Sequence, residues 1–256
     1  MSNGFAFILQ ARSGSKRLPN KILLPFYNEK TILDIQLENL QKNFPGALII
    51  LATTTNKADD VIAEKYAGNK SINIYRGEEE NVLKRFIDAA KAFRVESIVR
   101  ICSDNPFLSM KFCVELIDAY FKVWPDYTSF CFNNGTPSIK SHCGLFAEMV
   151  SLKTLEAVLN STTEPLYYEH VTNYIYSHPD SFKINFLPVP PFIDSYLDKL
   201  RLTIDTESDF TNLQKLYLAV LKKYGEKYTV EQLLTEVDRD KELVRIMTEQ
   251  IRNHAK

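Results

Sequence analysis

The sequence predicts an α/β fold built on a doubly wound, mostly parallel sheet. Short continuous apolar runs recur along the first half of the chain, as expected of parallel strands covered on both faces. Segments with helical periodicity separate these runs, and the connections of roughly twenty residues are long enough for parallel crossovers. With 256 residues, of which 45% are hydrophobic and 25% charged, the chain suits one large domain.

The expected strands and helices alternate along the chain. Phe5 to Leu9 is expected to form the first buried strand, and the helix after it begins near Thr31 and ends before Pro45-Gly46. The apolar stripe of that helix is made of Ile32, Ile35, Leu37 and Leu40. Further strands are expected at residues 47–52, 72–75, 97–102, 127–132, 182–187 and 201–204, and further helices at residues 59–67, 81–93, 110–123, 152–159 and 166–176 and from about 209 onward.

The stretch from about Asn133 to Leu200 departs from this regular alternation. Residues 133–141 are rich in turn formers, and a Pro-rich run from Pro188 to Pro191 follows a weak strand pattern. The sequence shows no internal repeat and no low-complexity linker, so residues 1–256 are expected to form a single domain. We expect residues 133–200 to be an inserted α+β segment that completes an acceptor pocket or a dimer interface.

Composition excludes several classes of partner. The formal net charge of −1 gives no general reason to expect nucleic acid or an anionic membrane as partner. No apolar run is long enough to span a membrane. The four cysteines form no CxxC pair, and no secretory leader is apparent, so we expect reduced thiols and a cytoplasmic protein.

The main candidate for a ligand site is a basic loop after the first strand. It carries Arg12, Lys16, Arg17 and Lys21, and no acidic residue precedes Glu29. Arg and Lys side chains bind phosphate oxygens, and Gly14 can turn backbone N–H groups toward an anion. The loop follows a buried strand, where open α/β sheets bind ligands, and this favours a triphosphate site over a solvated basic loop. It matches neither a GxGxxG turn nor a P-loop.

Two carboxylates are expected at the same edge of the sheet. Asp104 follows the strand expected at residues 97–102, and Asp205 follows the strand expected at residues 201–204. Two carboxylates that face a triphosphate indicate Mg²⁺, which takes one or two carboxylates together with phosphate oxygens and water. The alternative is that each Asp serves a turn or a helix cap, as Asp205 does if it only starts the following helix.

The stretch Gln10-Ala11-Arg12-Ser13-Gly14-Ser15-Lys16-Arg17-Leu18-Pro19-Asn20-Lys21 resembles the signature loop of bacterial cytidylyltransferases that activate acidic sugars. The pattern is most similar to the spore-coat polysaccharide biosynthesis protein F type, and more distantly to CMP-Kdo synthetases and acylneuraminate cytidylyltransferases. Further stretches similar to the family recur in the family's order between residues 5 and about 215, at residues 52–60, 75–79, 100–106, 169–172 and 201–206.

The resemblance implies a fold of the nucleotide-diphospho-sugar transferase type, CTP as donor, Mg²⁺ as cofactor and a homodimer. The implied reaction transfers CMP to an acidic sugar and releases pyrophosphate, for surface polysaccharide synthesis. Catalytic roles would fall to Arg12, Lys21 and Asp104, and metal binding to Asp104 and Asp205. The implied nucleotide contacts are Ala11, Arg12, Gly14, Ser15, Lys16, Arg17, Lys21, Thr53, Asn56 and Arg76. The implied acceptor contacts are Arg100, Glu148 and His170.

The chain departs from the family pattern at three positions. Asn20 replaces a usual glycine, and Asn81 replaces a usual acidic residue. Phe146 stands where relatives tend to carry Asp in a segment that would face the acceptor. This change indicates either a different acceptor or a core residue on a strand.

Two other functions remain open from the sequence. The first is a glycosyltransferase that uses a preformed nucleotide sugar, although a diphosphate needs fewer cations than this loop carries. The second is a non-catalytic nucleotide-binding subunit, which only the loss of Asp at the position of Phe146 favours.

Overall fold

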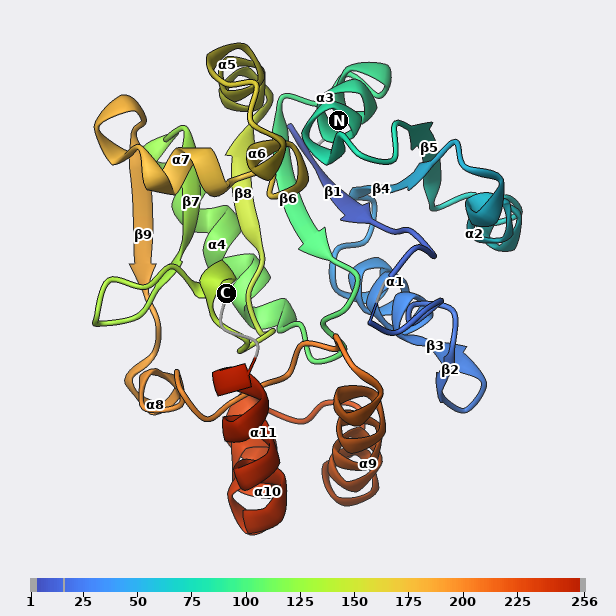
Figure 1. Ribbon diagram of the computed structural model, residues 1–256, viewed down its shortest axis with the longest axis vertical. Helices are drawn as coiled ribbons and strands as arrows, with labels where there is room; N and C mark the ends of the chain where they lie inside the picture. The colour runs from blue at the N-terminus through green and yellow to red at the C-terminus, as the bar shows by residue number, and fades with distance from the viewer. Residues whose placement is uncertain (1–3, 16, 254–256) are drawn as a thin grey trace.

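The computed structural model describes residues 4–15 and 17–253, and within them the chain forms one seven-stranded sheet with helices on both faces (Figure 1). The strand order is β5-β4-β1-β6-β8-β7-β9. The strands of this sheet are β1 (Phe5–Gln10), β4 (Leu48–Thr54), β5 (Asn73–Gly77), β6 (Ser97–Cys102), β7 (Tyr127–Cys131), β8 (Glu148–Ser151) and β9 (Ile184–Pro188). A small hairpin of β2 (Pro25–Tyr27) and β3 (Lys30–Thr31) follows the basic loop.

The predicted parallel sheet is confirmed. Strand β1 pairs in parallel with β4 and β6, and β4 pairs in parallel with β5, so their carboxyl ends meet at one edge. Strand β8 was not predicted from the sequence, and it runs antiparallel to both of its neighbours, β6 and β7. Because β8 and β9 lie in this sheet, residues 133–200 are part of the main domain.

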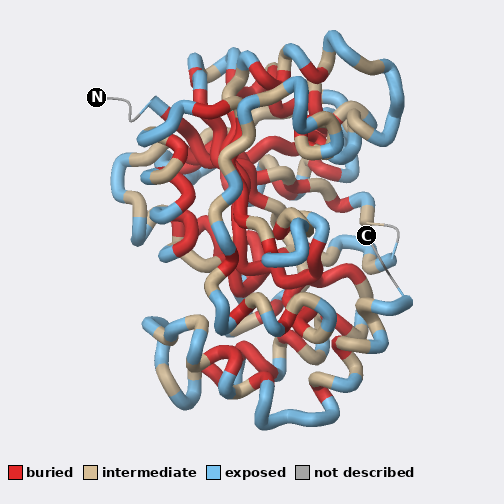
Figure 2. Tube along the Cα trace, turned by 90° about the vertical axis from the view of Figure 1, so that its left-hand side faces the viewer, coloured by how far each residue is buried: buried red, intermediate tan, exposed pale blue. Residues whose placement is uncertain are grey.

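Two buried layers cover the sheet. On one face α3 (Val82–Ala92), α5 (Leu152–Ser161) and α7 (Asn173–Ser177) pack over the even-numbered side chains of β1. On the other face α1 (Ile32–Asn43) and α4 (Met110–Val123) pack over the odd-numbered ones. Figure 2 shows the buried segments concentrated along the middle of the molecule, with exposed turns around them. The remaining helices are α2 (Asp60–Tyr66), α6 (Pro165–Glu169), α8 (Pro191–Asp194), α9 (Glu207–Tyr224), α10 (Val230–Arg239) and α11 (Lys241–Asn253).

The local sequence explains where α1 begins. Thr31 accepts a hydrogen bond from the backbone N–H of Asp34, and the Asp34 carboxylate accepts one from the backbone N–H of Thr31, which together make a capping box. All four predicted stripe residues of this helix are buried. The helix follows directly on the hairpin and so fixes the far end of the basic loop.

Two expectations about secondary structure are wrong. Residues 201–204 do not form a strand, because Leu202 N–H donates to the carbonyl of His142 and Ile204 N–H to that of Asp104, without a ladder. The single helix expected at residues 166–176 is two short helices, α6 and α7, separated at residues 170–172. The C-terminal segment from residue 207 is helical as expected, and its apolar residues belong to the same core cluster as α1 and α4. No helix of the described residues is long and apolar enough to cross a membrane.

Candidate functional site

The carboxyl ends of β1, β4 and β6 bring the predicted ligand segments together. The basic loop begins where the buried Ala11 donates its N–H to the carbonyl of Ala52 at 3.1 Å. Thr53 lies next along β4, and Asp104 follows β6. These segments therefore lie together at one edge of the sheet, as predicted. Lys16 lies outside the described residues.

A buried carboxylate anchors the start of the loop. Asp59 Oδ1 accepts hydrogen bonds from the backbone N–H of Ser13 at 2.7 Å and from its hydroxyl at 2.6 Å. The hydroxyl of Thr54 donates to the other carboxylate oxygen, Oδ2. Asn56 positions Asp59 by capping the short 3₁₀ turn at Lys57–Asp59. Asp59 thus ties the loop to the end of β4.

The backbone of the loop is compatible with the departure from the family pattern at Asn20. Asn20 has a φ of 57°, a left-handed conformation that Asn adopts more readily than most residues other than glycine. Its N–H donates to the carbonyl of Ser13 at 3.1 Å and closes the turn. At Gly14 a Cβ would lie 3.3 Å from Glu79 Oε1, the end of a flexible side chain.

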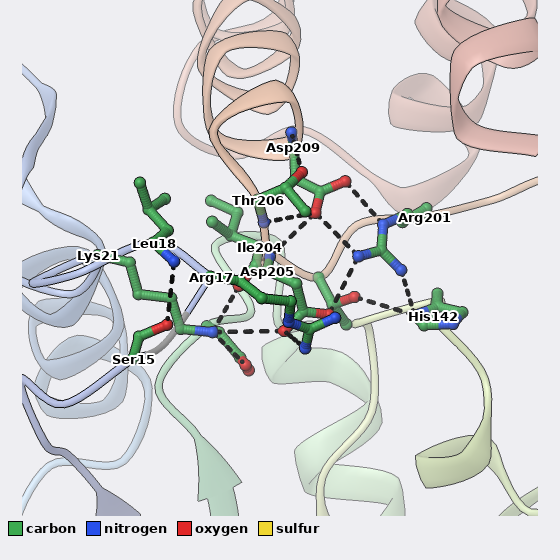
Figure 3. A network of polar contacts seen from close by, with 12 residues as sticks. Ser15, Arg17, Leu18, Lys21, His142, Arg201, Ile204, Asp205, Thr206 and Asp209 are labelled. Carbon is green, nitrogen blue, oxygen red and sulfur yellow. Dashed lines mark hydrogen bonds and ion pairs between the residues drawn. The ribbon is translucent and has the colours of Figure 1, made fainter. Parts of the chain in front are cut away.

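Lys21 joins the two predicted metal carboxylates. Its ammonium lies 3.0 Å from Asp104 Oδ2. The same ammonium lies 3.5 Å from Asp205 Oδ1 and donates to the carbonyl of Ile204 at 2.6 Å (Figure 3). Burial alone would lower the pKa of Lys21, but the charges and hydrogen bonds of the two carboxylates outweigh it and raise the pKa. Lys21 therefore stays charged between the two carboxylates.

Asp205 is fixed from both sides. Arg17 Nη2 lies 2.8 Å from Oδ1, and the fully buried Arg201 donates to Oδ2 at 3.0 Å (Figure 3). Arg201 also holds Asp209 through Nε and Nη2 at 2.7 and 2.8 Å, and its Nη1 donates to His142 Nδ1 at 2.6 Å. Burial would raise the pKa of Asp209, but Arg201 outweighs it and lowers the pKa. This network leaves Oδ1 of Asp205 directed toward the basic loop.

The predicted base and ribose contacts line the ends of β4 and β5. Arg76 donates from Nε to the carbonyl of Thr54 at 2.8 Å and from Nη2 to Asp60 at 2.6 Å. Asn56 Nδ2 donates to Glu79 Oε2 at 2.8 Å. The Oγ1 of Thr53 is buried without a partner among the described residues. Arg76 therefore stabilises the turn after β4 through these hydrogen bonds. Thr53 and Asn56 lie in the same region of the chain.

Two of the predicted acceptor residues contact each other. Arg100 and Glu148 are opposite residues of β6 and β8, and they form a buried ion pair. The Glu148 carboxylate also accepts from the hydroxyls of Tyr127 and Thr172, the latter at 2.9 Å. Close to this cluster in the chain, His170 follows Glu169, whose carboxylate lies 3.3 Å from Arg12 Nη2. The segment around α6 therefore connects the predicted acceptor side to the basic loop.

Phe146 is a core residue. Its ring stacks at 4.8 Å from that of Phe112 and lies 4.6 Å from that of Phe130, and only 8% of the residue is exposed. Of the two interpretations left by the sequence, the structure supports packing. The phenylalanine at this position belongs to the aromatic cluster between α4 and β7.

Three residues of this region were missed from the sequence: Asp59, Arg85 and Arg201. The fully buried Arg85 lies among the buried apolar positions of α3, namely Val82, Leu83, Phe86 and Ala89. A charged residue on a buried helical stripe is unusual, and that pattern was the available signal. Asp59 and Arg201 lie within stretches similar to the family, but nothing local indicated their partners.

The donor set fits Mg²⁺ bound together with a nucleotide. No group of three or more His, Cys, Asp or Glu side chains within residues 4–15 and 17–253 forms a preformed metal site. Asp104 and Asp205, both held by one lysine, supply two hard oxygen ligands. Mg²⁺ commonly takes such a pair and fills the rest of its octahedron with phosphate oxygens and water.

Comparisons with known proteins show what the chain is similar to. A family model described as cytidylyltransferase matches residues 6–246. The spore coat polysaccharide biosynthesis protein SpsF of Bacillus subtilis is 31% identical over 245 residues, which cover 93% of this chain and 95% of that protein. An uncharacterised protein of Methanocaldococcus jannaschii is 39% identical over 217 residues, which cover 85% of this chain and 83% of that protein.

Solved structures show the same fold. A cytidylyltransferase from Leptospira borgpetersenii is similar with a TM-score of 0.80 and 25% identity, over 94% of this chain and 96% of that chain. A CMP:2-keto-3-deoxy-manno-octonic acid synthetase solved with CTP has a TM-score of 0.61 and 12% identity, over 84% of this chain and 98% of that chain. The second likeness shows a shared fold.

Proposed function

Because the chain belongs to the cytidylyltransferase family, we propose that it transfers CMP from CTP to an acidic sugar and releases pyrophosphate. The acceptor would be an ulosonic or nonulosonic acid, and the product would serve surface polysaccharide synthesis, as the name of the Bacillus subtilis relative suggests. The observation that carries the proposal is the meeting of Arg17 and Lys21 with Asp104 and Asp205 at one point.

The chemistry would be an in-line displacement. A hydroxyl of the sugar attacks the α-phosphorus of CTP, the bond from that phosphorus to the bridging oxygen breaks, and pyrophosphate leaves while the hydroxyl proton passes to solvent. Arg12, Arg17 and Lys21 would hold the phosphate oxygens, and such positioning can carry the step without a covalent intermediate. Asp104 and Asp205 would hold Mg²⁺, which neutralises charge on the phosphates when it is bound.

On the acceptor side, Arg100 is the expected counter-charge for a sugar carboxylate. Its Nη1 is engaged by Glu148, whereas its Nε is buried without a partner among the described residues. Because Glu169 contacts Arg12 at 3.3 Å, the neighbouring His170 is a further candidate contact for the acceptor. We also propose a homodimer with residues 133–200 at its interface, which light scattering of the purified chain tests.

The test is pyrophosphate release. The chain is incubated with CTP, Mg²⁺ and a panel of acidic sugars, and pyrophosphate is measured. We expect release with CTP that depends on one acidic sugar, and a loss of at least about a hundredfold in Asp104→Ala, because that change removes a predicted metal ligand. A chain that binds no nucleotide in a thermal-shift panel of CTP, UTP, ATP and GTP contradicts the proposal.

The two alternative functions have no specific support in the structure. Phe146, the residue that favoured a non-catalytic subunit, belongs to the aromatic core. The glycosyltransferase alternative requires a preformed nucleotide sugar as donor, and measurable pyrophosphate release would exclude it. An Asp104→Ala variant that is as functional as the parent would support the non-catalytic alternative.

A further inference from the structure

Arg85 is a buried cation that the proposed reaction leaves without a role. It lies on the sheet-facing side of α3, is 0% exposed, and donates from Nη1 to the carbonyl of Glu78 and, at 3.2 Å, to that of Glu79. A Cβ at Gly77, the last residue of β5, would lie 3.1 Å from Arg85 Cγ. The arginine therefore lies directly against the carboxyl end of β5.

One edge of the Arg85 guanidinium has no partner among residues 4–15 and 17–253. Nε and Nη2 of Arg85 are both buried and form no hydrogen bond with the described residues. These two nitrogens form the side-on fork of an arginine, which donates two parallel hydrogen bonds to adjacent acceptors. Arg201 uses this same edge to hold both oxygens of Asp209. A buried pair of donors without acceptors is costly, and this points to a ligand that carries two acceptors side by side.

The charges around Arg85 favour a neutral ligand over a second phosphate. Burial and, to a smaller extent, the Arg12 guanidinium lower the pKa of Arg85 to about 10, although the carboxylates of Asp59 and Glu79 act in the opposite direction. The two cations and the two carboxylates thus balance each other. Lys21 and the metal carboxylates meet beyond β6, whereas Arg85 lies at β5, on the other side of β4 and β1. A triphosphate bound along the loop would accordingly extend its base toward Arg85.

We propose that Arg85 recognises the base of the nucleotide, donating from Nε and Nη2 to the adjacent O2 and N3 acceptors of cytosine. The inference rests on the proposed function and adds to it the residue that selects the base. Uracil presents an N3–H donor at the corresponding position, so it would oppose a donor of Arg85 and leave one hydrogen bond unmade. Because the edge is buried in the ligand-free chain, the turn at residues 78–80, whose Glu78 and Glu80 are exposed, must shift to admit the base.

The experiment measures binding by calorimetry with Mg²⁺ and without an acceptor sugar. CTP, UTP and 3-deaza-CTP, in which N3 is replaced by CH, are titrated into the unaltered chain and into Arg85→Lys. In the unaltered chain we expect 3-deaza-CTP and UTP to bind about ten- to a hundredfold more weakly than CTP. In Arg85→Lys, which keeps the charge and loses the fork, the three ligands should bind within a few-fold of one another.

Arg12→Lys is the matched control. Arg12 lies on the phosphate loop, so its conservative change should weaken CTP, UTP and 3-deaza-CTP alike and leave their ratios unchanged. If Arg85→Lys weakens all three ligands equally, Arg85 is a phosphate contact and the base assignment is wrong. If the variant does not fold, the ligand series on the unaltered chain decides, since equal binding of CTP and 3-deaza-CTP overturns the inference.

The outcomes separate this inference from the proposed function. An unaltered chain with no preference for CTP contradicts the proposed function itself. A preference for CTP that survives in Arg85→Lys leaves the proposed function standing and refutes only the assignment of Arg85.

Discussion

At the scale of single residues, the three cations of the basic loop that the structure describes are already paired in the ligand-free chain. Arg12 contacts Glu169, Arg17 contacts Asp205, and Lys21 contacts both Asp104 and Asp205. Phosphate oxygens would therefore replace carboxylates around these side chains. The loop keeps its cations in place before the nucleotide arrives, which is a form of preorganisation.

The first prediction concerns Lys21. In Lys21→Ala we expect the affinity for CTP with Mg²⁺ to fall by at least about tenfold, because a charge-assisted contact to phosphate is lost. Thermal shift and calorimetric titration measure this affinity. Lys30→Ala is the control, since Lys30 is half-exposed and its ion pair with Glu38 lies on the surface. Equal CTP affinity in the two variants would show that Lys21 does not contact the nucleotide.

The sequence indicated the charged residues of the basic loop. It did not indicate the buried residues that hold the loop and its neighbours in position. Arg12, Arg17 and Lys21 could be predicted because their charges cluster within a short stretch after a strand. Asp59 acts on Ser13 across 46 positions, and Arg201 acts on His142 across 59. Partners so far apart leave no periodic or local signal, so only the folded chain shows them.

At the scale of elements, the parallel strands were predictable because they are continuously apolar, and β8 was missed because it is not. Strand β8 begins with Glu148, which a sequence pattern assigns to the surface, and Arg100 of the neighbouring strand neutralises it. At residues 201–204 the sequence pattern predicts a strand that the structure does not have. Leu202 and Ile204 alternate with polar residues and are buried, yet they contact loops instead of a strand.

The second prediction tests that loop contact. Gly144 has a φ of 64°, and a Cβ there would lie 2.8 Å from the carbonyl oxygen of Leu202. Gly144→Ala should lower the free energy of unfolding by about 2–4 kcal/mol, from the strained φ and the backbone clash together. Gly135→Ala is the matched control, since Gly135 has a φ of 86° and open space around it. Denaturant unfolding should show a loss of only about 1 kcal/mol there.

The third prediction concerns the start of α1. Burial would raise the pKa of Asp34, but Lys65, Thr31 and Tyr66 outweigh it and lower the pKa below its usual 3.8. The ionised form therefore stabilises the fold fully above pH 4, and this stabilisation is lost as the pH falls through the lowered pKa. Asp34→Asn should cost about 1–3 kcal/mol at pH 7 and less at pH 3.

Denaturant unfolding at both pH values measures this difference. Asp180→Asn serves as control, because Asp180 is exposed and its substitution should change stability little at either pH. A loss in Asp34→Asn that is the same at pH 3 as at pH 7 contradicts the assigned pKa direction.

At the scale of the whole molecule, the site joins segments from opposite ends of the chain. The basic loop precedes the first helix, whereas Arg201 and Asp205 precede α9 and Asp209 lies in its first turn. Apolar residues of α1, α4, α9, α10 and α11 share one core cluster, so the two ends are packed into a common interior. A ligand held by both ends therefore acts on the stability of the whole chain.

The last prediction follows from this shared core. CTP with Mg²⁺ at a hundred times its dissociation constant adds about 2.7 kcal/mol to the folded state. For a chain of this size the gain corresponds to a rise of about 5–10 °C in the midpoint of one calorimetric transition. Addition of EDTA should reduce the rise, since the phosphates then lose the cation that Asp104 and Asp205 would hold. Two transitions, of which only one moves with CTP, would show that the C-terminal helices unfold independently of the site.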